Sequence, residues 1–209
     1  MIIDCISDIH GYLPQLKGGD LLLIAGDLTA RDEPHEFEAF KQWLKKQDYT
    51  KKILIAGNHD NFLFHLKNPF SYFDESVYLH DSATEFSGLK IWGTPWTKNF
   101  IGQNPLCKAF GLDFDFQMDE KFSLIPDDID ILITHTPPEG ILDNGPRGRL
   151  GCSGLRKKVE KMDKLKLHLF GHIHEGFGMQ ESSGGMKFIN ASFVNEHYNP
   201  INTPIRVIL

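Results

Sequence analysis

The sequence has few of the features that indicate a disulfide framework, a zinc ribbon or a membrane span. It holds three cysteines among 209 residues, and Cys5, Cys107 and Cys152 show no CxxC spacing. An odd number of widely spaced cysteines argues against disulfide bonds and structural zinc, so we expect reduced thiols. No apolar run approaches the ~20 residues that a membrane helix requires, so we expect no membrane span.

Positive charge is also scarce. The chain carries 22 Lys and Arg residues against 28 Asp and Glu residues, a formal net charge of -6. Extended binding along a nucleic-acid backbone depends on clustered Lys and Arg, so we do not expect it here. A small nucleotide or phosphoester substrate stays open, because bound cations reverse the local charge. No basic, cleavable leader precedes the first apolar run, so we expect a cytoplasmic protein.

The remaining composition is that of an ordinary globular enzyme. The chain is 41% hydrophobic and 24% charged, and its length allows one sizeable core. It shows no internal repeat and no low-complexity linker, so we expect a single domain over residues 1–209.

Continuous apolar runs predict strands that are buried on both faces, as in a layered α/β protein. They lie at residues 2–6, 21–25, 53–56, 89–92, 129–133 and 165–170, with shorter candidates at 77–79, 186–189 and 205–208. A helix is expected from Pro34 through the lysines after Leu44, and another at residues 155–162. Residues 94–116 and 144–154 are expected to be loops, the first long enough to suggest a functional role.

Polar side chains follow several of these strands at the point where each strand should end. They are Asp8, Asp27, Asn58, His135 and His172. Ligands bind at the carboxyl ends of strands in open α/β sheets, so these side chains are expected to converge on one rim. Glycines directly before Asp27, Asn58 and His172 permit tight turns there.

The residue types at this rim indicate a catalytic metal centre. His10 and His174 lie two residues beyond Asp8 and His172 and enlarge the candidate ligand set. Carboxylate, imidazole and amide oxygen without thiolate favour Mn, Fe, Zn or Ni in a catalytic site. The set exceeds what one ion needs, and two ions that share a bridging carboxylate would use it fully.

Five motifs in order resemble the calcineurin-like metallophosphoesterase superfamily. They are DIH at residues 8–10, GDLT at 26–29, GNHD at 57–60, THTPP at 134–138 and GHIH at 171–174. The longer strings IAGNHD, IWGTPW and INAS resemble the branch of MPPED-type metallophosphodiesterases. The resemblance implies two mixed β-sheets packed as a sandwich and flanked by helices.

The resemblance also implies a role for each residue. Asp8, His10 and His174 would hold one metal ion. Asn58, His135 and His172 would hold the second, with Asp27 bridging the two. His59 would donate a proton or stabilise the phosphate, and Asp60 would orient its imidazole.

The implied reaction is attack of a dimetal-bridging hydroxide on a phosphoester, with Mn²⁺ the expected metal and Fe, Zn or Ni as alternatives. Because His59 must be protonated while the bridging water is deprotonated, a bell-shaped pH profile is expected.

The branch resemblance favours phosphodiesters such as cyclic nucleotides. A phosphomonoesterase or protein phosphatase with the same metal core and a catalytically weak metal-binding scaffold stay open. The oligomeric state also stays open. An amidohydrolase barrel is too large for this chain, since it typically needs ~250 residues.

Substrate contacts are the least constrained part of the site. Arg31 follows the bridging ligand closely, and Arg147 lies in a glycine-rich segment where its guanidinium could bind phosphate. Trp96 and Phe100, in the long loop, are candidates for stacking on a nucleobase, with core packing as the alternative. Arg31, Trp96 and Arg147 are therefore the candidate substrate-binding residues.

Overall fold

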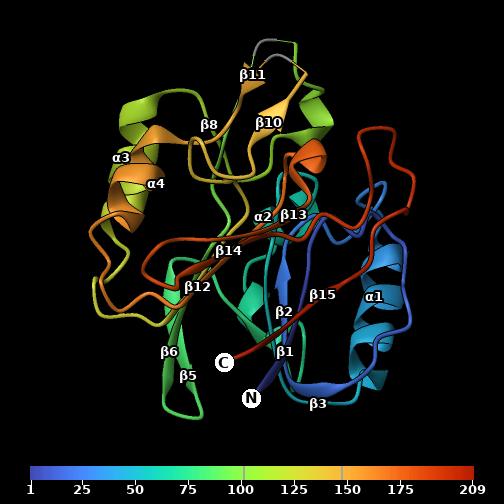
Figure 1. Cartoon of the computed structure of the whole chain (residues 1–209). Helices are drawn as coiled ribbons and strands as arrows, with labels where there is room; N and C mark the ends of the chain where they lie inside the picture. The colour runs from blue at the N-terminus through green and yellow to red at the C-terminus, as the bar shows by residue number, and fades with distance from the viewer. Residues whose placement is uncertain (101, 147) are drawn as a thin grey trace.

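Two mixed β-sheets pack face to face, and helices cover their outer faces (Figure 1). The computed structural model describes residues 1–100, 102–146 and 148–209. This arrangement confirms the predicted fold class. Among the described residues, none of the helices is both long and apolar enough to cross a membrane.

The first sheet has five strands, and its four consecutive strands from β1 to β4 run parallel. Their order is β15 (Ile205–Ile208), β1 (Ile2–Ile6), β2 (Gly19–Ala25), β3 (Tyr49–Ile55) and β4 (Val77–Tyr78). The C-terminal strand β15 pairs antiparallel with β1. The two chain ends therefore lie together, with the Met1 amino group 2.7 Å from the Leu209 carbonyl oxygen (Figure 1).

The second sheet has six strands, with a parallel centre and an antiparallel strand at each edge. Their order is β13 (Gly178–Glu181), β14 (Lys187–Asn190), β12 (Leu167–Phe170), β9 (Ile131–Thr134), β6 (Leu89–Thr94) and β5 (Ser82–Phe86). None of the residues in the edge strands β5 and β13 is fully buried, so the apolar pattern that predicted the central strands did not reveal them.

The space between the sheets is filled mainly by aliphatic side chains, together with Cys5, from alternate strand positions. Cys5, Leu23, Ile55, Ile133 and Leu169 belong to this completely buried layer. The intervening residues face outward and pack under helices, which explains why the strands read as continuous apolar runs. Helix α1 (Pro34–Lys46) covers the first sheet, while α3 (Asp115–Ser123) and α4 (Ser153–Val159) lie together over the second (Figure 1).

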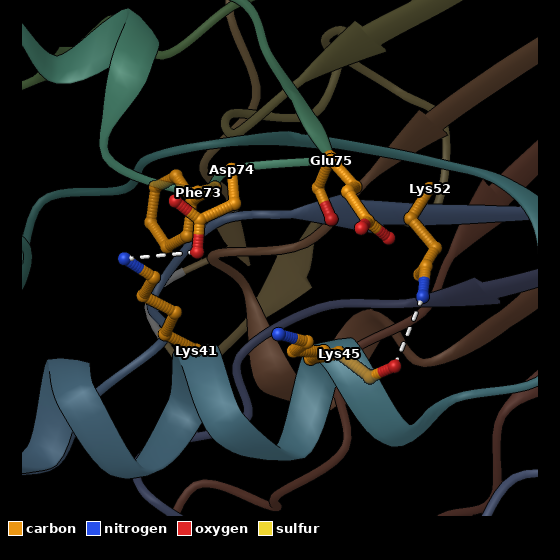
Figure 2. A pocket seen from close by; sticks show the side chains of 7 residues that line it. Lys41, Lys45, Lys52, Phe73, Asp74 and Glu75 are labelled. Atoms are coloured by element: carbon orange, nitrogen blue, oxygen red, sulfur yellow. Dashed lines mark hydrogen bonds and ion pairs between the residues drawn. The ribbon is translucent and has the colours of Figure 1, made fainter.

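Helix α1 begins and ends as its sequence predicts. Pro34 occupies its first turn, and the Glu36 carboxylate accepts the backbone N–H of Glu33 at 3.1 Å. At the other end, Lys52 of β3 donates to the carbonyls of Leu44 at 3.1 Å and Gln47 at 3.0 Å. Figure 2 shows this lysine reaching toward the last turn of the helix, where a cation stabilises the negative end of the helix dipole.

The segments expected to be loops contain short regular elements. Residues 94–116 include β7 (Thr97–Lys98), η2 (Pro105–Cys107) and β8 (Gly111–Leu112), and α3 begins within the same segment. The described part of 144–154 forms the hairpin strands β10 (Asn144–Gly145) and β11 (Gly148–Arg149). Two further short helices, α2 (Asn61–His65) and η1 (Pro69–Ser71), lie in a region where no element was predicted.

Candidate metal centre

The loops after β1, β2, β3, β9 and β12 bring the predicted ligands into one cluster. The loop after β1 runs alongside the loop after β2, since the N–H groups of Asp8 and His10 donate to the carbonyls of Gly26 and Asp27. Asp8, His10, Asp27 and His172 all have positive φ, at 49°, 44°, 53° and 68°. Left-handed backbone at several non-glycine positions is strained, and such strain concentrates at functional sites.

The first half of the cluster consists of Asp8, His10 and His174, whose candidate ligand atoms all lie within 4.8 Å of one another. His174 directs Nε2 to within 3.3 Å of Asp8 Oδ1, because its Nδ1 lies 3.0 Å from the Asn195 carbonyl and donates to it. An imidazole fixed in this way by a backbone carbonyl is the usual arrangement for a metal-ligating histidine.

The second half of the cluster is arranged in the same manner around Asp27. His135 Nδ1 lies 2.7 Å from the Ala25 carbonyl, which leaves Nε2 at 3.3 Å from Asp27 Oδ2 and 3.1 Å from Asn58 Oδ1. The His172 ring lies beside His135, with ring centroids 5.1 Å apart. Since Asp27 Oδ2 is also 3.7 Å from His10 Nε2, Asp27 joins the two halves, as its predicted bridging role requires.

Burial and neighbouring charges set the pKa values of these groups. Burial raises the pKa of Asp8, but hydrogen bonding and charge from His174 outweigh it and lower the value. Burial lowers the pKa of His10 to about 4 and that of His172 to about 3. For His135, the charge of Asp27 overcomes the effect of burial and raises the pKa to about 9. His10 and His172 are therefore neutral at pH 7, the form in which imidazole binds a metal.

The cluster fits two divalent cations. His10 is 4% exposed, and neither of its ring nitrogens has a hydrogen-bond partner in the described protein. Buried polar atoms are rarely left without a partner unless an ion or water supplies one. Two glycines leave the space that the carboxylates of the cluster occupy. A Cβ at Gly57 would lie 2.2 Å from Asp27 Oδ1, and a Cβ at Gly171 would lie 2.0 Å from Asp8 Oδ2.

The INAS string supports the ligands from behind. Asp8 accepts the Ser192 hydroxyl at 2.8 Å and the His172 backbone N–H at 3.0 Å. The Asn190 amide donates to the Ile173 carbonyl at 2.8 Å and so anchors the turn between the two histidines of the GHIH motif. Ser192 and Asn190 therefore help to position the predicted ligands, although neither belongs to the predicted ligand set.

His59 lies at the edge of the cluster, beside His10 and Asp27. Its Nε2 is 4.0 Å from Asp27 Oδ2, and its backbone N–H donates to Asp27 Oδ1 at 2.9 Å. The position is compatible with the predicted role in proton donation or phosphate stabilisation. That role stays a prediction.

Asp60 does not occupy the position expected of a residue that orients His59. Its carboxylate accepts the backbone N–H groups of Leu28 at 3.0 Å and Gly57 at 2.8 Å. Cys107 Sγ, rather than Asp60, lies 3.6 Å from His59 Nδ1. Asp60 therefore fixes the backbone that carries Asp27 and Asn58, because two N–H donors converge on one buried carboxylate.

The Cys107 segment has a second contact that sequence reasoning missed. The Asn58 side-chain amide donates to the Cys107 carbonyl at 3.1 Å, which turns Asn58 Oδ1 toward His135 and the metal cluster. Gln103 donates to the same carbonyl. These partners lie far from the motifs in sequence, and no local pattern identifies them.

A cavity of about 280 Å³ opens onto the cluster. Asp27, Asn58, His59, His172 and His174 form part of its lining. The side walls combine apolar, acidic and amide side chains, and they include Phe100, Gln103, Asn104, Leu150, Ile173, Glu175, Glu196 and Tyr198.

Most of the predicted substrate-binding residues lie outside the described cavity lining, whereas the predicted metal ligands form one cluster. Trp96 is 9% exposed, donates its indole N–H to Asp81, and packs against Phe110 with ring centroids 5.9 Å apart. This hydrogen-bonded core position contradicts its predicted stacking on substrate. Arg31 is exposed outside the described cavity lining, and the Arg147 prediction lies outside the described residues. Phe100 does line the cavity.

The layered fold and paired ligand clusters define a binuclear metallophosphoesterase type of protein. Residues 1–176 match the family described as calcineurin-like phosphoesterase. The chain is 37% identical over 233 residues to human metallophosphoesterase domain-containing protein 1, covering 98% of this chain and 70% of the human protein. A UPF0046 protein of Caenorhabditis elegans is 35% identical over 237 residues, covering 96% and 58%. The chain belongs to the calcineurin-like phosphoesterase family, whose members are dimetal-dependent.

Proposed function

We propose that this metal-dependent phosphoesterase hydrolyses phosphodiesters, with cyclic nucleotides among the candidate substrates. The observation that carries the proposal is the convergence of carboxylate, imidazole and amide donors around the buried Asp27, next to an open cavity. Asp8, His10 and His174 would hold one divalent ion, Asn58, His135 and His172 would hold the other, and Asp27 would contribute to both.

The bound ions would supply an activated water nucleophile and stabilise charge on the phosphate oxygens. The protein's own groups orient the reactants. His174 and His135 are fixed by the carbonyls of Asn195 and Ala25, so each presents Nε2 to the centre. His59, beside Asp27, would give a proton or a hydrogen bond to the phosphoester.

The charge of the cavity supports a diester over a monoester. Its described lining contains Glu175 and Glu196 but no Lys or Arg. A diester carries one negative charge at neutral pH, whereas a monoester carries close to two. Without additional described cations to offset the second charge, the acidic walls disfavour the monoester.

Three further parts of the proposal concern the metal, the partners and the cellular location. The donor set suits Mn²⁺, with Fe, Zn or Ni as alternatives. The proposed partner is a small phosphoester or nucleotide, without a membrane or an extended nucleic acid. The three cysteines are free thiols, which agrees with the reducing cytoplasm that we propose as its compartment.

The test compares hydrolysis of bis-p-nitrophenyl phosphate and p-nitrophenyl phosphate by chelator-treated protein after Mn²⁺ is restored. We expect metal-dependent turnover of the diester, its loss in Asp27→Ala, and a strong reduction in His59→Ala. A cyclic-nucleotide screen follows that result. Preference for the monoester would identify a phosphatase instead, and no turnover by protein shown to bind two metals would favour a scaffold. A flat pH profile between about pH 5 and 10 would contradict the proposed role of His59.

A further inference from the structure

Tyr198 lies over the metal-ligand cluster, although no sequence motif marks it. Its ring centroid is 4.8 Å from that of His10, 5.4 Å from His174 and 6.1 Å from His59. The same residue lines the cavity above the cluster. A group bound at the metal centre would therefore lie next to this ring.

The loop that carries Tyr198 is tied to the centre at two points. The Asn195 carbonyl receives the Nδ1 proton of His174, and the same carbonyl accepts the Tyr198 backbone N–H at 2.8 Å. The Tyr198 carbonyl accepts the Tyr12 hydroxyl at 3.2 Å. Because these contacts begin at a predicted ligand and end two residues beyond His10, the loop is positioned by the same elements as the metal site.

The conformation of Tyr198 is unusual for a bulky residue. Its φ is +59°, a left-handed backbone that is costly for any side chain with a Cβ and persists when surrounding contacts determine it. The residue nevertheless remains 47% exposed. A tyrosine held in this way serves packing poorly, since nearly half of its surface stays uncovered beside the cavity.

We propose that the Tyr198 ring contacts the alcohol group of the substrate and gives the site a preference for phosphoesters of flat, aromatic alcohols. This inference rests on the proposed binding of phosphoesters at the metal centre. It moves the aromatic contact once expected of Trp96 to the C-terminal loop. Phe100 and Leu150 supply further apolar surface in the same cavity.

The preference can be measured by binding, without turnover. Isothermal titration of Mn²⁺-loaded protein with the methyl esters of phenylphosphonic and methylphosphonic acid, here called phenylphosphonate and methylphosphonate, compares two ligands that carry one negative charge, as a diester does, and different organic groups. Aromatic contacts of this kind typically change affinity by about tenfold, so wild-type protein should bind phenylphosphonate about tenfold more tightly. Tyr198→Phe should keep that ratio because it keeps the ring.

Tyr198→Asn removes the ring. Asparagine is the replacement because it tolerates the left-handed backbone better than most residues. We expect it to reduce the ratio to about twofold, chiefly by weakening phenylphosphonate binding. Phe116→Asn removes an exposed ring outside the described cavity lining and should leave the ratio unchanged. Metal content is measured in every variant.

The inference is overturned if wild-type protein shows no preference, or if Tyr198→Asn weakens both phosphonates equally, which would indicate that the ring only positions the imidazoles. Diester turnover on the same samples separates this result from the proposed function. Turnover with no ring-dependent preference refutes the inference alone. A ring-dependent preference without turnover supports the inference and refutes the phosphodiesterase proposal. Wild-type protein that binds neither phosphonate refutes the inference, and turnover again decides the function.

Discussion

Gly57 is the position where one added carbon should damage the metal centre most directly. A Cβ there would lie 2.2 Å from Asp27 Oδ1 and 2.6 Å from His135 Nε2, whereas ordinary van der Waals contacts begin at 3.4 Å. Gly57→Ala therefore requires Asp27 Oδ1 or the β3 loop to move by about 1 Å. Because Asp27 bridges the two halves of the cluster, that movement affects both metal positions.

The expected loss follows from the contacts that Asp27 must give up. Its Oδ1 accepts the His59 backbone N–H at 2.9 Å, and a hydrogen bond to a charged group contributes about 1.5–3 kcal/mol. Overpacking in a tightly packed site costs about 1–3 kcal/mol. We expect Gly57→Ala to reduce the free energy of unfolding by about 2–4 kcal/mol. Metal affinity should fall by at least 10–100-fold, as when the supports of metal ligands are altered.

Urea unfolding of the metal-free protein and chelator competition for Mn²⁺ measure the two effects separately. Gly184→Ala is the matched control, because a Cβ at Gly184 would meet nothing closer than 3.8 Å and the residue has no positive φ. If Gly57→Ala binds Mn²⁺ as tightly as Gly184→Ala, the close packing of Gly57 against the bridging carboxylate does not govern the metal site.

Three other perturbations test separate parts of the structure. Chelation of bound metal should lower the melting temperature in differential scanning fluorimetry, because metal that binds only the folded state stabilises it; an unchanged melting temperature would contradict a preformed metal site. Gln103→Leu removes a donor to the Cys107 carbonyl and should weaken Mn²⁺ binding severalfold in chelator competition, whereas the exposed Gln42→Leu should not; equal affinities would dismiss the support role. Burial raises the pKa of Asp4, but hydrogen bonds led by Arg206 outweigh burial and lower the pKa. The stabilisation from these hydrogen bonds is therefore fully present above the ordinary carboxyl pKa of 3.8, and it is lost as the pH falls through the pKa of the folded state. Arg206→Met should therefore lower the free energy of unfolding at pH 7 and have much less effect in acid, as measured by urea unfolding; a pH-independent difference would refute the linkage.

The sequence was most informative where a hydrophobic pattern also determines where the next residue lies in the sheet. Buried parallel strands produce continuous apolar runs, and a polar residue after such a run must lie at the carboxyl edge of the sheet. Asp8 after β1 and Asp27 after β2 could therefore be placed together before the structure was known, and the structure brings them into one cluster. The assignment of the whole chain to one domain stays a prediction.

Side-chain partners were harder to predict than positions. Asp60 follows His59 directly, yet neighbouring residues in a turn point in different directions, and its carboxylate meets two backbone N–H groups instead. Trp96 and Phe100 lie in the same loop and have similar chemistry. The structure buries Trp96 because Asp81 accepts its indole N–H, while Phe100 faces the cavity. Sequence distance alone does not distinguish such a pair.

The groups that no motif revealed share a physical origin. Cys107 ends the short helix η2, and Gln103 and Tyr198 lie in loops, so their contacts with the site depend on how these segments cross the sheet edge. Cys107 acts through its carbonyl on Asn58, and any residue type provides a carbonyl, so composition contains no signal for it. Tyr198 lies over the cluster because Asn195, three residues before it in the chain, accepts the Nδ1 proton of His174. The predicted metal ligands thus lie at or just beyond strand ends, whereas loops form much of the cavity surface beside them. If Tyr198 contacts substrate as we propose, a change at this loop position should alter substrate preference without any change in the predicted metal-binding motifs.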